Sequence, residues 1–341
     1  MKYQVSLYVF FVTGVLLFSS CEKVLMEKEL SADAVNNFNT LAKTIDDKYS
    51  YHILKNINWD SIVKANRSKI SNEMNIFEEF MVYDEMLYAL KDGHVNLYSG
   101  FDISRNWEWY LNSPSNFNWD IIERNYLGDN YLISGGLRHT ILVDNDKKYS
   151  YVYYGSFSSG MSYIDLVKSI AIQSKSKGII IDVRNNGGGY LSHAEDFAAH
   201  FTDKKKVGYL EYYKAGPEHD DFSGSIANYI EPKGESWDGP VVVLTNRKCY
   251  SATSFFVTMM KEHPNVTVLG DDTGGGAGLP VDYTLPNGWY LRFSSTRCTN
   301  ADGEDFELGV SADEYLDLNE NDILNGMDTI IERAKDIIDA N

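Results

Sequence analysis

The hydrophobic positions of the chain change their spacing along the sequence, and the first region has helical spacing. Between residues 30 and 97, apolar side chains recur every three or four positions, as at Phe80, Tyr83 and Leu87. This period places them on one face of an α-helix. We therefore expect an N-terminal helical domain over residues 30–97.

Residues 98–154 show a different pattern, in which aromatic and other side chains alternate. Tyr149, Tyr151 and Tyr153 are the clearest example, and a period of two is typical of a β-strand. Glycine-containing turn signals separate these short segments. We expect a β-rich connector over residues 98–154.

From residue 155 onward, short apolar runs alternate with helical segments. The runs 179–183 and 240–245 contain hardly any polar residue, which is typical of strands that are buried on both faces. Strands alternating with helices indicate a mostly parallel sheet covered by helices. The predicted fold class is therefore α/β, with a core domain over residues 155–338 that has buried strands and flanking helices.

The first residues of the chain have the layout of an export signal. Lys2 precedes an apolar stretch, 5–18, that is too short to span a membrane comfortably. The following Leu-Phe-Ser-Ser-Cys resembles a bacterial lipobox, which predicts cleavage of a signal peptide, 1–20, and lipidation of Cys21. The predicted location is the cell envelope, as an exported periplasmic or outer-membrane lipoprotein held to the membrane only by its lipid. An ordinary signal peptide that happens to carry a cysteine is the alternative.

Charge and cysteine content exclude several classes of function. A net charge of −18 repels polyanions, and no local basic patch offsets it, so we expect no nucleic-acid partner. Beyond Cys21 only Cys249 and Cys298 remain, too few for a disulfide framework; whether they pair is open. The sequence contains no HExxH or CxxC spacing, and we expect neither metal nor cofactor.

A serine at the start of a helix is the strongest candidate for chemistry. The apolar run 241–245 leads through a short turn to Ser251, and a helical pattern then continues to Lys261. The first turn of a helix offers unpaired N–H groups that stabilise negative charge. Ser251 could therefore act as a nucleophile, with the N–H of Ala252 holding an oxyanion. The structural alternative is a serine that merely caps the helix.

Two further segments could complete such a site. A buried strand ends in the run Gly187-Gly188-Gly189, where a backbone N–H can approach a ligand without a Cβ in the way. Gly188 is the preferred second oxyanion donor and Gly187 the next choice, although the run could equally form a tight turn. His94 lies at a predicted junction between helix and strand, and imidazole is the commonest base for a serine nucleophile. Taken alone, His94 could also be a structural residue.

Together, the segments 182–189, 245–254 and 270–278 resemble the S41 serine peptidases, the family of tail-specific (C-terminal processing) proteases and the tricorn core. The resemblance implies a ClpP/crotonase-like core, a peptide or protein substrate and no cofactor. It also implies Ser251 as nucleophile, with Gly188 and Ala252 forming the oxyanion hole. By the same resemblance, His94 stands where the tricorn-like branch carries its histidine base.

The sequence departs from the tail-specific branch at the position of the base. Those enzymes use a lysine where this chain has Gly276, so the resemblance favours a Ser–His pair over a Ser–Lys pair. Glu307 occupies a place similar to the late glutamate of the tricorn-like branch and is the third predicted catalytic residue. The serine that precedes the histidine in the tricorn relay is Gly93 here, which leaves open how Glu307 would orient His94.

Two non-catalytic functions also remain open from the sequence. The first is an inactive lipoprotein that keeps this fold and binds a small hydrophobic ligand or a peptide, as the retinoid-binding relatives of the family do. The second is a surface lipoprotein with a structural or adhesive role. The region 98–154 is too short to contain the PDZ domain that many tail-specific proteases carry, so capture of a protein C-terminus by strand addition is not expected.

Overall fold

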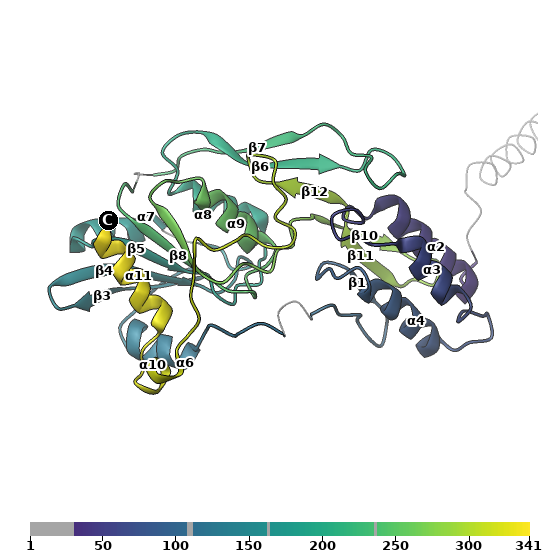
Figure 1. Cartoon of the computed structure of the whole chain (residues 1–341), viewed down its shortest axis with the longest axis horizontal. Coiled ribbons are helices and arrows are strands. Elements are labelled where there is room, and N and C mark those ends of the chain that lie inside the picture. The colour runs from purple at the N-terminus through teal and green to yellow at the C-terminus, as the bar shows by residue number, and fades with distance from the viewer. Residues whose placement is uncertain (1–30, 108–111, 162–163, 235–236) are drawn as a thin grey trace, which may run out of the picture.

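The computed structural model describes residues 31–107, 112–161, 164–234 and 237–341. The predicted signal peptide and Cys21 lie outside these residues. The chain forms a larger α/β lobe and a smaller helical lobe, which lie at opposite ends of an elongated molecule (Figure 1). None of the helices in the described ranges is long and apolar enough to span a membrane.

The helices and strands follow one another in an order that places most of the helical lobe first. The helices are α2 (Ala34–Lys48), α3 (Trp59–Arg67), α4 (Ile76–Tyr88), α6 (Trp119–Ile121), the π-helix η1 (Ile122–Leu127), α7 (Ile164–Ser174), α8 (Leu191–Ala199), α9 (Ala252–Lys261), α10 (Glu320–Leu324) and α11 (Thr329–Ala340). The strands are β1 (Asn96–Tyr98), β2 (Leu132–Ser134), β3 (Leu137–Asp144), β4 (Lys147–Tyr154), β5 (Ile179–Asp182), β6 (Lys206–Tyr213), β7 (Ile226–Ile230), β8 (Val241–Thr245), β9 (Val266–Gly270), β10 (Pro280–Thr284), β11 (Tyr290–Ser294), β12 (Thr296–Thr299) and β13 (Glu314–Tyr315).

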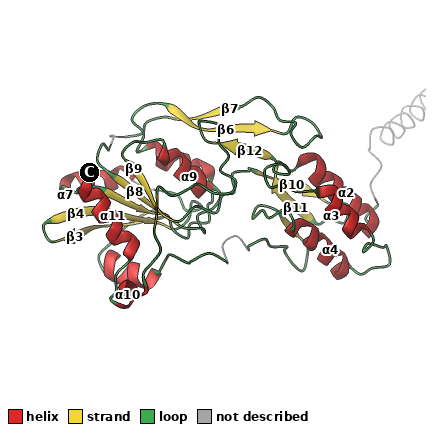
Figure 2. Cartoon of the chain, viewed as in Figure 1, coloured by secondary structure: helices red, strands yellow, loops and turns green. Residues whose placement is uncertain are grey.

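A seven-stranded mixed sheet in the order β13-β9-β8-β5-β4-β3-β2 forms the centre of the α/β lobe. Its strands from β13 to β4 pair in parallel, whereas β4, β3 and β2 form an antiparallel meander. Helices cover the sheet (Figure 2). The predicted α/β fold class is confirmed.

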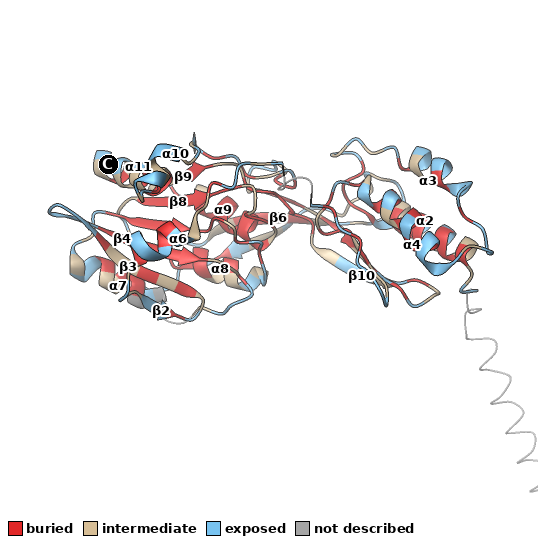
Figure 3. Cartoon of the chain, turned by 90° about the horizontal axis from the view of Figure 1, so that it is seen from below, coloured by how far each residue is buried: buried red, intermediate tan, exposed pale blue. Residues whose placement is uncertain are grey.

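Alternate residues of the central strands enter two separate hydrophobic clusters, one on each face of the sheet. Ile179 and Ile181 pack in the cluster that includes residues of α7, α8 and α9, while Ile180 packs in the cluster that includes α11. Both faces of β5 and β8 are therefore buried, which Figure 3 shows for β8. This two-sided burial is the physical reason that these strands contain hardly any polar residue.

The helical lobe is completed by strands from late in the chain. β10 and β11 form a sheet with β1, and Leu291 and Phe293 join the same hydrophobic cluster as Phe38 and Tyr83 of the helices. A third sheet, β12-β6-β7, extends from the α/β lobe toward the helical lobe (Figure 1).

The strand pairing differs from the expected division of the chain at two places. The segment 98–154, expected as a connector, provides β2, β3 and β4 to the central sheet. The segment 155–338, expected as a separate core, provides β10 and β11 to the helical lobe. Both differences arise from pairing between distant segments, which local periodicity does not encode.

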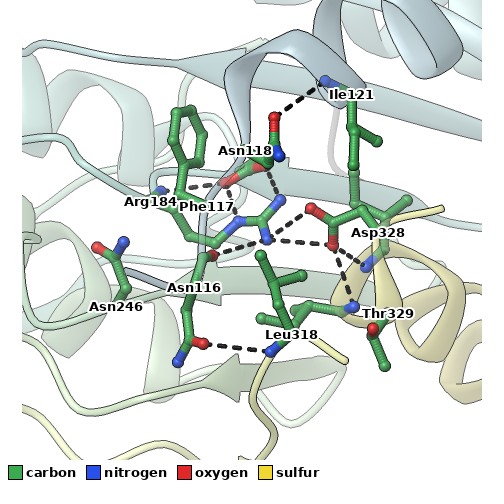
Figure 4. Close-up of polar contacts among 12 residues, drawn as sticks. Asn116, Phe117, Asn118, Ile121, Arg184, Asn246, Leu318, Asp328 and Thr329 are labelled. Atoms are coloured by element: carbon green, nitrogen blue, oxygen red, sulfur yellow. Dashed lines mark hydrogen bonds and ion pairs between the residues drawn. The ribbon is translucent and has the colours of Figure 1, made fainter. Parts of the chain in front are cut away.

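A buried ion network anchors the loop that follows β5. Arg184 is fully buried and contacts Asp182 at 2.6 Å. It also contacts Asp328 at 3.0 Å (Figure 4). It also donates to the carbonyl of Asn116 at 3.1 Å. The side chain of Asp328 in turn accepts the N–H groups at the start of α11. The network therefore joins the end of β5 to the C-terminal helix just before the glycine run begins.

We expect Arg184→Ala to lower the free energy of unfolding by about 3–5 kcal/mol, because it leaves two buried carboxylates without a cation. Denaturant unfolding followed by tryptophan fluorescence measures the effect. Arg333→Ala is the matched control, since Arg333 pairs with Glu314 at the surface, with its side chain 43% exposed; its effect should lie within about 0–1 kcal/mol. Equal effects of the two substitutions would contradict the anchoring role of Arg184.

Candidate active site

Ser251 lies in the turn between β8 and α9 with an unusual backbone conformation. Its φ is 56° and its ψ is −125°, a region that non-glycine residues rarely occupy and that costs about 1–3 kcal/mol. The residue occupies the N-cap position of α9, yet its side chain makes no capping hydrogen bond. The Ser251 hydroxyl therefore does not cap α9, which was the structural alternative considered from the sequence.

The Ser251 hydroxyl faces the imidazole of His94, which comes from the other lobe. The distance from Ser251 Oγ to His94 Nε2 is 3.0 Å, although the two residues are 157 positions apart in the chain. α4 ends at Tyr88, and a tight turn follows in which Val95 N–H donates to the Asp92 carbonyl at 3.0 Å. This turn holds His94 at the junction of the two lobes.

His94 is surrounded in a way that favours its neutral form. Burial lowers the pKa of His94 to about 4, against the opposing effect of the Asp92 carboxylate and the Gly278 carbonyl. Within the described ranges, the buried Nδ1 atom has no hydrogen-bond partner that meets normal geometry. A neutral imidazole next to a hydroxyl can accept its proton, which is the property of a general base.

The two predicted oxyanion donors lie beside Ser251. A Cβ placed on Gly188 would stand 2.8 Å from the Ser251 Cβ and 3.0 Å from the Ala252 nitrogen, so only glycine allows this approach. Gly188 N–H donates to the side chain of Asn186 at 3.0 Å. Ala252 is the first residue of α9, where the helix offers its N–H no acceptor.

The structure explains why no lysine could stand at position 276. A Cβ on Gly276 would lie 2.5 Å from the ring of Tyr250, and the backbone there has a φ of +79°. Tyr250 is buried and its ring lies 5.0 Å from that of His94. An aromatic side chain thus fills the space beside the imidazole that a side chain from residue 276 would need.

Glu307 does not contact His94 directly. Its Oε2 accepts the N–H of Gly278 at 3.1 Å, and its Oε1 lies 2.7 Å from the ammonium of Lys55. The carbonyl of the same Gly278 raises the pKa of the His94 imidazole. Glu307 therefore holds the residue whose carbonyl lies beside the imidazole, and it does not contact the imidazole itself.

Lys55 joins Glu307 to the turn that carries His94. Its ammonium also lies 3.1 Å from Asp92, and all three side chains are almost completely buried. Asp92 Oδ1 accepts the backbone N–H of His94 at 2.8 Å, and Oδ2 accepts the hydroxyl of Tyr49 at 2.8 Å. One cation thus connects two carboxylates that come from opposite ends of the sequence.

Burial and the shared cation determine the protonation of Asp92, Glu307 and Lys55. Burial opposes ionisation of Asp92, but Lys55 brings its pKa down to about 2, and Asp92 remains a carboxylate. Burial raises the pKa of Glu307 to about 7, against the opposing effect of Lys55. Burial opposes the charge of Lys55, yet the two carboxylates raise its pKa, so it stays protonated.

His94 and Glu307 were predicted from the sequence, but Asp92 and Lys55, which connect them, were not. Asp92 could have been suspected from its place two residues before His94, in a turn where a carboxylate can accept a backbone N–H. Lys55 has no such signal, because its partners lie 37 and 252 positions away along the chain. Cys249 and Cys298 are both buried free thiols, so they do not pair.

Comparison with protein-family models gives a match over residues 148–316, to the model described as peptidase family S41. A probable CtpA-like serine protease of Staphylococcus haemolyticus is 28% identical over 154 residues, which are 44% of this chain and 30% of that protein. The chain therefore matches less than a third of the length of that curated relative.

Solved structures extend the similarity over most of the chain. The crystal structure of a peptidase candidate from Parabacteroides merdae is 40% identical, with a TM-score of 0.85, and the match covers 90% of this chain and 96% of that one. The photosystem II D1 C-terminal processing protease shares 15% identity at a TM-score of 0.52, covering 83% and 93%. The second similarity shows the fold alone.

The pKa of His94 predicts the acid limb of the pH profile. If neutral His94 is the base, kcat/KM should rise with pH around a midpoint near 4, below the ordinary histidine value of 6.5. Peptide hydrolysis measured from pH 3 to 9, with fluorescence as a check on folding, tests this. Glu307→Gln is the control variant, since it removes the carboxyl whose pKa is about 7; a midpoint at 6.5 or above in both proteins would contradict the assignment.

Proposed function

The chain belongs to peptidase family S41, as the sequence resemblance indicated, and we propose that it hydrolyses peptide bonds through an acyl-enzyme on Ser251. The observation that carries the proposal is the 3.0 Å separation between Ser251 Oγ and His94 Nε2. A hydroxyl at that distance from a neutral, buried imidazole is the arrangement that general-base activation of a serine requires. The substrate is a peptide or a protein.

The first half of the reaction forms the acyl-enzyme. His94 Nε2 takes the proton of the Ser251 hydroxyl while Oγ attacks the scissile carbonyl carbon. The carbonyl oxygen becomes an oxyanion that accepts hydrogen bonds from the N–H groups of Ala252 and Gly188. Collapse of this intermediate breaks the C–N bond, and the leaving amine receives the proton from His94.

The second half restores the enzyme. Water takes the place of the amine and loses a proton to His94 as it attacks the ester carbonyl, and Ser251 Oγ then leaves and regains a proton from His94. The products are a carboxylic acid and an amine. In both halves the Gly188 N–H exchanges its bond to Asn186 for a bond to the charged oxyanion, which is the stronger acceptor.

The residues around the pair hold it in place and do not exchange protons with the substrate. Asp92 accepts the backbone N–H of His94, and Glu307 accepts the N–H of Gly278, the residue whose carbonyl lies beside the imidazole. Lys55 is the cation that both carboxyl groups share in this buried setting. We therefore assign Glu307 a positioning role, in place of the direct catalytic role expected from the sequence.

Labelling with a fluorophosphonate tests the nucleophile and its base together. We expect intact protein to take up one label at Ser251, located by mass spectrometry of its peptides, and Ser251→Ala to take up none. His94→Ala should slow labelling and peptide hydrolysis by about 10²–10⁴-fold without unfolding the chain, because general-base catalysis contributes on that scale.

Ser68→Ala serves as the control, since Ser68 is an exposed serine at the end of α3, and it should label like the unaltered protein. A folded protein that takes up no label at Ser251 would favour the inactive binding lipoprotein. Normal turnover of His94→Ala would remove His94 from the mechanism.

We also propose that the peptidase acts outside the cytoplasm as an envelope lipoprotein anchored through Cys21. The support is the lipobox-like sequence that ends at this cysteine. Expression of the full chain in a bacterium fed a labelled fatty acid should give a labelled protein in the membrane fraction. Cys21→Ala should lose the label, and equal labelling of the two proteins would contradict lipidation at Cys21.

A further inference from the structure

We infer a binding site for a divalent transition-metal ion of the zinc class, formed by Asp46, His52 and His219 at the contact between the two lobes. One potential ligand atom from each residue lies within 4.8 Å of the other two. Asp46 belongs to α2, His52 follows that helix, and His219 lies in the loop that joins β6 to β7. Segments more than 160 residues apart therefore bring the three side chains together.

His52 already has the arrangement of a metal ligand. It is 1% exposed, and its Nε2 lies 3.0 Å from the backbone carbonyl of Ile45, to which it can only donate a proton. The proton is thus on Nε2, and Nδ1 carries a lone pair. Within the described ranges this buried Nδ1 has no hydrogen-bond partner.

This pattern is what metal-binding histidines show. Such a histidine almost always donates its second ring N–H to a carbonyl or a carboxylate, which fixes the tautomer and turns the other nitrogen toward the ion. A buried polar atom without a partner is otherwise unfavourable. An ion at Nδ1 would satisfy it.

His219 and Asp46 provide the other two ligands from the solvent side. His219 Nε2 lies 2.9 Å from an oxygen of Asp46, and the side chains are 33% and 44% exposed. The His219 ring stacks on the His52 ring at a centroid distance of 4.0 Å. An ion can therefore enter from solvent, and water can complete its coordination.

The site closes with a small movement. Ligand atoms around a tetrahedral zinc ion with bonds near 2.1 Å stand about 3.4 Å apart. The present separations reach up to 4.8 Å, so binding requires the partly exposed His219 side chain to rotate out of its stack on the His52 ring. Two imidazoles and one carboxylate suit zinc and similar ions, whereas calcium and magnesium prefer oxygen ligands.

The surrounding charges favour a dication. Lys214 is the nearby cation on the same hairpin, and its ammonium donates to the backbone carbonyl of Glu218. Burial lowers the pKa of Lys214, and four nearby carboxylates oppose this effect, those of Asp221, Asp220, Asp46 and Asp47. These four carboxylates outnumber Lys214 and Lys43, the latter of which pairs with Asp47 at 2.8 Å.

A bound ion would connect the two lobes through its protein ligands. The loop that carries His219 reaches from the third sheet to the end of α2 (Figure 1). His52 is three residues before Lys55, the cation that joins the two carboxylates beside the active site. No metal was expected from the sequence, because these three residues match no ligand motif and His219 lies far from the other two along the chain.

Isothermal titration of chelator-treated protein with Zn²⁺ tests the inference. The unaltered protein should bind one ion per chain, and Zn²⁺ should raise its thermal midpoint. His219→Gln and Asp46→Asn should each weaken binding at least about tenfold and remove that rise. Both residues are partly exposed, so these variants should fold even if substitution of buried His52 does not.

Two control variants locate the ion. His193→Gln removes a histidine on α8, and His94→Gln removes the active-site imidazole; both should bind Zn²⁺ like the unaltered protein. The inference is overturned if fewer than half of the chains bind an ion. It is also overturned if His219→Gln and Asp46→Asn bind Zn²⁺ as tightly as the unaltered protein, because the ion would then be elsewhere; loss of binding in His94→Gln or His193→Gln would show where.

Discussion

A single buried cation, Lys55, holds the two lobes of this protein in the relation that the active site requires. Its ammonium lies between Asp92, two residues before His94, and Glu307, which accepts the backbone N–H of Gly278. Removing Lys55 would leave its two buried carboxyl partners without a cation, which is far less favourable than the intact arrangement. The 3.0 Å contact between His94 and Ser251 therefore depends on a polar cluster that touches neither reacting atom.

Backbone conformation prepares the other side of the site. Ser251 adopts a positive φ at the start of a helix whose described side chains are almost all buried. Gly188 approaches it so closely that any side chain would collide with the Tyr250 carbonyl. Strain of this kind persists only where the surrounding fold compensates for it, and here the sheet with helices on both faces and the Arg184 network provide that compensation. The fold consequently places Ser251 and the candidate oxyanion donors next to one another before a substrate arrives.

The sequence predicted what depends on local pattern and missed what depends on distant contacts. The apolar runs of β5 and β8, the helix after Ser251 and the glycine run all carry a signal within a few residues. The pairing of β11 with β1 carries none, since the two strands lie nearly 200 positions apart. For the same reason Lys55 and the cluster of His52 with His219 could not be foreseen. The requirement for glycine at position 276 was equally unpredictable, because it arises from the Tyr250 ring, which excludes a side chain there.

The central claim is that Ser251, His94 and two backbone amides converge on one reacting carbonyl. A crystal structure of the protein after reaction with a peptide phosphonate tests it most directly. The account predicts a bond from Ser251 Oγ to phosphorus, a phosphonyl oxygen that accepts from the N–H groups of Ala252 and Gly188, and His94 Nε2 still within hydrogen-bond distance of Oγ. A phosphonyl oxygen that faces solvent, with Gly188 still bound to Asn186 and the imidazole turned away, would contradict it.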